Sequence, residues 1–105
     1  MKFSATREQL LCLMANAVNA SSPVGMGFLQ FQNKVYSPAD MESYVIDDKE
    51  IFTSLDYVDG RMVKLTIFKQ EGQYIIRDGF TADYQSFMCR YATVEDLVKS
   101  AGIKI

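Results

Sequence analysis

The residues of this chain that could do chemistry are mainly carboxylates, and many of them fall in one short stretch. Positions 40 to 59, here called the acidic segment, hold seven acids and a single base, Lys49. A dense region of one charge favours docking of a partner of the opposite charge. The candidate partner-binding residues are acids of this segment and one neighbouring aromatic: Asp40, Glu42, Asp47, Asp48, Glu50, Asp56 and Tyr57.

The stretch after the acidic segment carries the opposite charge. Two or three arginines beside an aromatic ring could hold a small anionic metabolite or a nucleotide. The candidate ligand-binding residues on this alternative are Arg61, Arg77, Arg90 and Tyr74. A third interpretation needs no partner, because the acidic and basic stretches could neutralise each other as solvated faces across a hairpin.

The chain has no histidine, which removes the commonest general base and the commonest metal ligand. Cys12 and Cys89 lie too far apart in sequence for metal-ligand spacing, and we expect both to be free, buried thiols. We therefore expect neither an enzyme nor a protein with a cofactor or metal. A sequence pI near 5.0 also makes nucleic acid an improbable partner, since phosphate binding needs positive charge.

Length and composition predict one folded domain over residues 1–105. The chain is 49% hydrophobic and 23% charged, which is ordinary for a globular protein. No apolar run approaches the roughly 20 residues that a membrane-spanning helix needs. The first residues are too polar for a signal peptide, so we expect a cytoplasmic protein with no membrane association.

Capping and periodicity predict a first helix from about Arg7 to Asn19. Thr6 and Gln9 match a capping box, in which each side chain satisfies a backbone N–H group of the other residue. The apolar residues of this helix recur at helical spacing, as Leu10, Leu13, Met14 and Ala17, with Leu11 and Val18 widening the stripe. The helix should therefore lie against a core.

Two shorter helices are expected further along the chain. Ser37-Pro38 predicts a helix that ends near Tyr44, with serine as the cap and proline at the first helical position. A last helix is predicted from about Val94 to Ala101. Thr93 and Asp96 would cap its start, and Gly102 would terminate it.

Residues 52–78 predict an antiparallel meander of three strands. Asp59-Gly60 and Glu71-Gly72 separate apolar runs, as two-residue hairpin turns do. These turns would place Val58 opposite Arg61, Phe52 opposite Ile67 and Ile67 opposite Ile76. Strands near residues 24–35 and 83–91 would complete a mostly antiparallel sheet of about five strands.

Both faces of that predicted meander are substantially apolar. An antiparallel sheet with one face in water alternates more cleanly between apolar and polar residues. A helix, a further strand layer or a partner subunit should therefore cover part of the second face. This favours an interaction surface and makes a homodimer plausible.

The N-terminal residues Met1 to Leu11 resemble the opening of the bacterial DNA polymerase sliding clamp. Residues Ile51–Ser54 and Val58–Arg61 are also similar to a segment of that family. The resemblance implies a strand followed by a helix at the start of the chain. Met62-Val63 stand where the family has Phe-Pro, and the middle of the chain departs from the family's pattern. No function is carried over from it.

Together these patterns predict an α+β domain with an N-terminal amphipathic helix, a central meander and a short C-terminal helix. The function that they favour is that of a small non-enzymatic interaction protein, such as an inhibitor, an immunity-type protein or an adaptor. It would bind a partner through the acidic segment and an apolar sheet face. The alternative is a binder of a small anionic ligand.

Overall fold

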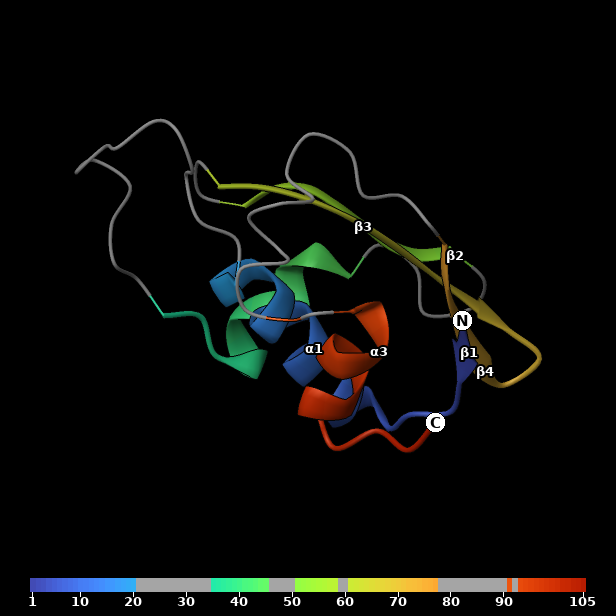
Figure 1. The fold of residues 1–105 in the computed structure, drawn as a ribbon. Helices are drawn as coiled ribbons and strands as arrows, with labels where there is room; N and C mark the ends of the chain where they lie inside the picture. The colour runs from blue at the N-terminus through green and yellow to red at the C-terminus, as the bar shows by residue number, and fades with distance from the viewer. Residues whose placement is uncertain (21–34, 46–50, 59–60, 78–90, 92) are drawn as a thin grey trace.

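The computed structural model describes residues 1–20, 35–45, 51–58, 61–77, 91 and 93–105, and for 51–57, 61–64 and 77 it describes the backbone only. In chain order the elements are strand β1 (Lys2–Phe3), helix α1 (Arg7–Ala20), 3₁₀ helix η1 (Pro38–Tyr44), strands β2 (Ile51–Val58), β3 (Arg61–Gln70) and β4 (Gln73–Arg77), and helix α3 (Val94–Ser100). Figure 1 shows α1, η1 and α3 on one side of the sheet, which gives an α+β domain of two layers.

The described strands form one antiparallel sheet in the order β1-β4-β3-β2. The prediction of about five strands is therefore wrong for the described residues. Three strands of five residues or more make the meander, and the edge strand β1 adds only two residues. The two further strands expected near residues 24–35 and 83–91 fall almost entirely outside the described residues. The order of β1 before α1 is the one that the sliding-clamp resemblance implies.

The predicted register is correct for β3 and β4 and partly wrong for β2. Val58 pairs with Arg61, and Ile67 pairs with Ile76, as two-residue turns require. However, Thr53 and not Phe52 lies opposite Ile67. The cause is a register shift between the pairs Tyr57–Met62 and Leu55–Leu65, where β3 carries one extra residue, as in a β-bulge. A second shift, between Thr53 and Ile51, returns Ile51 to Phe68, the partner that a two-residue turn predicts.

The second hairpin turn has the geometry that its sequence predicts. Glu71 and Gly72 connect β3 to β4 with φ angles of 52° and 77°. Both central residues of a type I′ turn need positive φ, and glycine adopts it without strain. This turn sets Lys69 opposite Tyr74, with the lysine ammonium 5.9 Å from the centre of the tyrosine ring.

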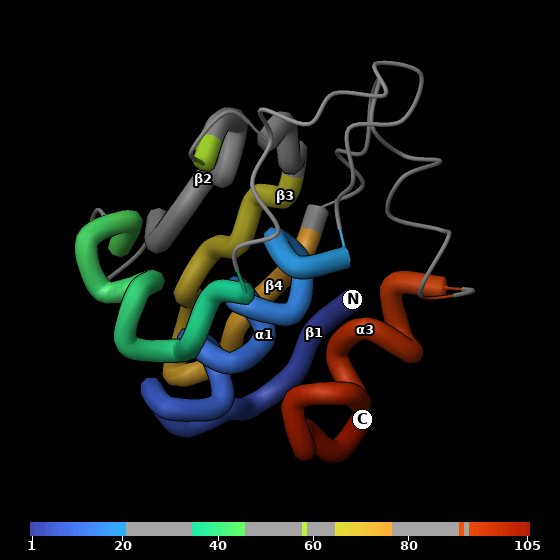
Figure 2. Tube along the Cα trace, turned by 90° about the vertical axis from the view of Figure 1, so that its left-hand side faces the viewer, coloured from blue at the N-terminus to red at the C-terminus, as the bar shows by residue number. Residues whose placement is uncertain are grey.

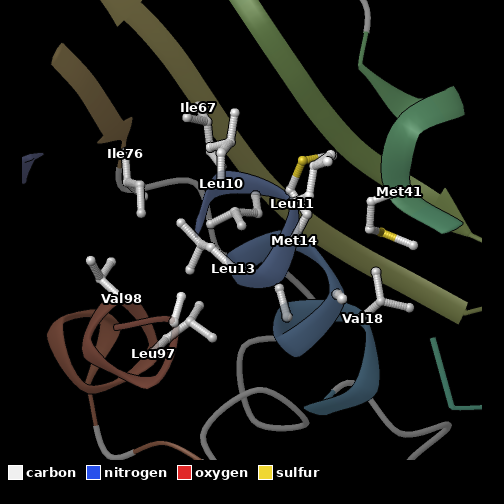
Figure 3. Close-up of a cluster of buried hydrophobic side chains, with 14 of the residues drawn as sticks. Leu10, Leu11, Leu13, Met14, Val18, Met41, Ile67, Ile76, Leu97 and Val98 are labelled. Carbon is white, nitrogen blue, oxygen red and sulfur yellow. The ribbon is translucent and has the colours of Figure 1, made fainter. Parts of the chain in front are cut away.

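The core lies between α1 and the inner face of the sheet. The predicted apolar stripe of α1 is confirmed, because Leu10, Leu13, Met14 and Ala17 are all fully buried. Leu65, Ile67, Tyr74 and Ile76 face these side chains from the sheet, and Figure 3 shows several of them meeting. On the opposite face, Phe68 and Ile75 are paired with each other and are partly exposed.

Helices η1 and α3 flank α1 on opposite sides (Figure 2). Each brings buried side chains to the core: Met41 from η1, and Leu97 and Val98 from α3 (Figure 3). Both predicted helices are confirmed within one residue of their expected ends. The helical layer is thus three elements wide, with α1 in the middle.

Candidate interaction groove

An open groove of about 690 Å³ lies over the N-terminal half of α1. Its walls are η1 on one side and the end of α3 on the other, so the groove follows from the way these two elements flank α1. It is lined by Thr6, Glu8, Gln9, Leu11, Cys12, Pro38, Ala39, Glu42 and Ala101. Its floor and walls are mainly small apolar groups, and its charged groups are carboxylates.

The α3 wall is fastened by neutral hydrogen bonds. The Thr6–Gln9 capping box is present, with the Gln9 N–H donating to Thr6 Oγ1 at 3.1 Å and the Thr6 N–H donating to Gln9 Oε1 at 3.0 Å. The remaining amide group of Gln9 donates from Nε2 to the Gly102 carbonyl at 3.0 Å. Gly102 ends α3 with a φ of 78°, a left-handed conformation that favours glycine. One side chain therefore caps α1 and holds the end of α3.

A second bond on the same side comes from Asn16, two turns further along α1. Its Nδ2 donates to Ser100 Oγ at 3.0 Å, and the Ser100 hydroxyl donates to the Leu97 carbonyl. Leu97 is fully buried beneath this contact. Apolar packing and side-chain hydrogen bonds thus act together to fix α3 against α1.

The η1 wall is held from its N-terminal end. Asn19 makes two hydrogen bonds with the backbone of the buried Tyr36: the Tyr36 N–H donates to Asn19 Oδ1 at 2.7 Å, and Asn19 Nδ2 donates to the Tyr36 carbonyl at 2.9 Å. Next to it, the Ser37 N–H donates to the Asp40 carboxylate at 2.9 Å. These contacts fix where η1 begins relative to α1.

At the rim of the groove, one ion pair links η1 directly to α1. Arg7 Nη2 donates to Glu42 Oε2 at 2.9 Å, and the two side chains remain 46% and 53% exposed. Such an exposed pair is screened by water and salt and contributes little to stability. Glu8, one residue further along α1, makes neither a hydrogen bond nor an ion pair through its carboxylate within the described part of the chain. The rim therefore presents two carboxylates. That of Glu42 is in an exposed ion pair that another cation could replace, and that of Glu8 has no such partner among the described residues.

Cys12 lies on the groove lining as a free thiol. The sequence predicts a buried thiol, and the structure shows a partly exposed one that packs at the edge of the core. Its nearest polar contact is Asn16 Nδ2, at 3.8 Å from the sulfur. No basic side chain contacts the thiol among the described residues. Cys12 can therefore be labelled chemically, but it is not activated as a nucleophile.

Of the candidate partner-binding residues that the structure describes, Glu42 lines this groove. Asp40 and Glu42 lie on η1, where both are exposed and both also serve the fold, through the Ser37 bond and the Arg7 ion pair. Asp56 and Tyr57 belong to β2, which forms the opposite edge of the sheet from β1. Asp47, Asp48 and Glu50 lie outside the described residues.

Of the candidate anion-binding residues, the structure describes Tyr74 with its side chain and Arg61 and Arg77 by their backbone. Tyr74 is buried, with its ring 5.9 Å from that of Phe3, and it belongs to the core. Arg61 pairs with Val58, and Arg77 pairs with Thr66. Their positions are therefore five residues apart along β3, or about 16 Å at the usual rise of a strand. Arg90 lies outside the described residues.

Of the residues that line the groove, Glu42 is the one that the sequence indicated as partner-binding. For Glu8 and Cys12, the one signal available was the i, i+4, i+8 spacing of Glu8, Cys12 and Asn16, which marks a polar stripe on the side of α1 away from its apolar stripe. That spacing says nothing about which elements flank the stripe.

Comparison of the chain with known protein families, with curated proteins and with solved structures finds no match. The described residues form a small α+β fold that carries an open, carboxylate-rimmed depression. None of the described helices is long and apolar enough to cross a membrane. Within the same residues, no three side chains of the metal-ligating types come together.

Proposed function

We propose that this protein is a small non-enzymatic interaction protein, an inhibitor, immunity-type protein or adaptor, that docks a protein partner through its acidic segment and an adjoining apolar surface. The observation that carries the proposal is the groove between η1 and α3. The exposed carboxylate of Glu42 on η1 stands beside an apolar lining, which is the combination that a protein interface uses at its rim and centre.

The absence of histidine supports the non-enzymatic part of the proposal. The described groove side chains also offer no paired acid and base. Glu42 is engaged by a guanidinium, and Cys12 has no basic neighbour among the described residues. Recognition by shape and charge requires none of these groups.

No observation favours the alternative of a small anionic ligand. The groove carries carboxylates, which repel an anion, and Arg7 beside it is already paired with Glu42. Tyr74 is unavailable as a binding surface because it is buried beneath Phe3 and Lys69.

The proposal includes a cytoplasmic location and a homodimeric state. The free thiol of Cys12 is typical of a reducing compartment. Phe68 and Ile75 supply partly exposed apolar surface on the outer face of the sheet, which a second copy of the chain could cover.

Charge reversal in the acidic segment tests the proposal. The variant Asp47→Lys, Asp48→Lys, Glu50→Lys should lose stoichiometric capture of the partner from an extract of the native host, because opposite charges are replaced by like charges. A matched control reverses Glu71 and Asp96, two exposed acids outside the segment, and should capture the partner normally. Undiminished capture by the first variant would overturn the proposal.

Native mass spectrometry of the gently purified protein separates the proposal from its alternative. A protein partner adds the mass of a whole chain, whereas a metabolite or nucleotide adds a few hundred daltons that denaturation releases. The same spectrum reports whether the chain is a homodimer. A bound small anion in stoichiometric amount would favour the ligand binder.

A further inference from the structure

The shape of the groove indicates what kind of occupant fits it. Pockets for small molecules enclose most of their ligand, whereas this depression of about 690 Å³ is open to solvent. It lies over α1 and is lined from η1 and from the end of α3; Figure 2 shows these two elements on either side of α1. An amphipathic helix lying in a groove of this kind would extend the helical layer outward over α1.

The lining indicates the chemistry of that helix. Leu11, Cys12, Pro38, Ala39 and Ala101 give a surface of small and medium apolar groups that would accept Leu, Ala or Met side chains. Both charged side chains of the described lining, Glu8 and Glu42, are carboxylates. A lysine or arginine of an occupant can pair with Glu8 directly and can exchange with Arg7 at Glu42, because that ion pair is exposed.

We infer that the groove binds a basic amphipathic helix of a partner protein, with its apolar face on Leu11 and Ala39 and its cations toward Glu8 and Glu42. This inference rests on the proposed function and names its site and the chemistry of its partner. It places the centre of the interface on the helical layer, with the acidic segment contributing Glu42.

A displayed library of helix-forming peptides provides the probe, with Lys, Glu, Leu, Ala and Ser varied at each position. Selection on the intact protein should enrich peptides that repeat apolar residues at i, i+3, i+4 and i+7 and carry Lys on the adjoining positions. Failure to enrich any peptide, or enrichment of acidic ones, would overturn the inference.

Variants of the groove then locate the selected peptide. Ala39→Arg places a bulky cation on an exposed wall position and should weaken binding about tenfold or more, whereas Ala39→Ser should leave it unchanged. Glu8→Lys should also weaken binding, and Glu71→Lys, a reversal in the β3–β4 turn, should not. Equal affinity of Ala39→Arg and Ala39→Ser would place the peptide elsewhere and overturn the inference.

Thiol protection gives an independent measurement. In a Cys89→Ser background, alkylation of Cys12 should slow when the selected peptide is bound, because the thiol lies on the lining. An unchanged rate would contradict occupancy of the groove.

The native partner then separates this inference from the function on which it rests. In one outcome, partner capture is lost on reversal of Asp47, Asp48 and Glu50 but kept in Ala39→Arg. The proposed function then stands, and the groove is not the site of binding. Capture that survives both changes overturns both.

Discussion

The two walls of the groove are built in different ways, although both pack against α1. The α3 wall is joined to α1 by neutral hydrogen bonds at its C-terminal end, from Gln9 to Gly102 and from Asn16 to Ser100. The η1 wall is fixed where it begins, by the two bonds between Asn19 and Tyr36, and is joined at the rim by the exposed pair of Arg7 and Glu42.

This difference indicates which wall of the groove can move when an occupant binds. Buried packing of Leu97 and Val98, together with two exposed hydrogen bonds that salt does not screen, holds α3 in position. An exposed ion pair holds the η1 rim only weakly and can be exchanged for another cation. The η1 rim is therefore the wall that we expect to respond to an occupant, and the α3 wall is the fixed reference.

The largest expected effects come from the apolar side chains that anchor each wall. Leu97→Ala on α3 and Met41→Ala on η1 each remove a fully buried side chain and should lower the free energy of unfolding by about 2–5 kcal/mol. Urea denaturation followed by circular dichroism measures both, and Met41→Leu is a volume-conserving control that should cost under about 1.5 kcal/mol. A cost below about 1 kcal/mol for Met41→Ala would show that η1 lacks the anchor described here.

Intermediate effects distinguish the polar contacts. Asn19→Ala leaves the N–H and carbonyl groups of the buried Tyr36 without their partners, so it should cost about 1–3 kcal/mol. Asn16→Ala removes a bond to an exposed hydroxyl that keeps its bond to Leu97, and it should cost about 1 kcal/mol or less. Both variants gain the same helix propensity, so the difference between their unfolding free energies isolates the contacts. Equal costs would show that Asn19 does not hold η1 in place.

The helices could be predicted from the sequence because their signals are local. The Thr6–Gln9 capping box and the apolar repeat of α1 lie within a few residues of each other, and each is sufficient to mark the helix. Glu71-Gly72 likewise contains the positive φ angles that its turn requires. The register shift between β2 and β3 had no such mark, because no glycine stands at the extra residue of β3, between Met62 and Leu65.

The groove could not be predicted because it depends on contacts between distant residues. Arg7 and Glu42 are 35 positions apart, and Gln9 and Gly102 are 93 apart. Capping rules predict where η1 and α3 begin, but they do not say that the two elements flank α1. The acids of η1 were indicated by their sequence density alone, and the structure adds that Glu42 lines a groove.

The smallest expected effect concerns the Arg7–Glu42 pair, and it bears most directly on the comparison of the walls. A double-mutant cycle with Arg7→Ala and Glu42→Ala should give a coupling of about 0.2–1 kcal/mol in dilute buffer, because both side chains are about half exposed. The coupling should fall further in about 1 M salt, where the screening length is about 3 Å. The pair of Glu95 and Lys99 within α3, 3.7 Å apart and equally exposed, is the matched control and should behave alike.

A coupling above about 2 kcal/mol that survives high salt would break the comparison, because the η1 rim would then be as firmly fixed as α3. A weak coupling would support the conclusion that the η1 rim is held less firmly than α3. Replacing Arg7 at Glu42 by a cation of a partner would then cost the fold little, and the free energy of the new pair would remain available for binding. Cycles at Arg7 and Glu42 in the presence of the selected helical peptide should accordingly show a smaller coupling than in its absence.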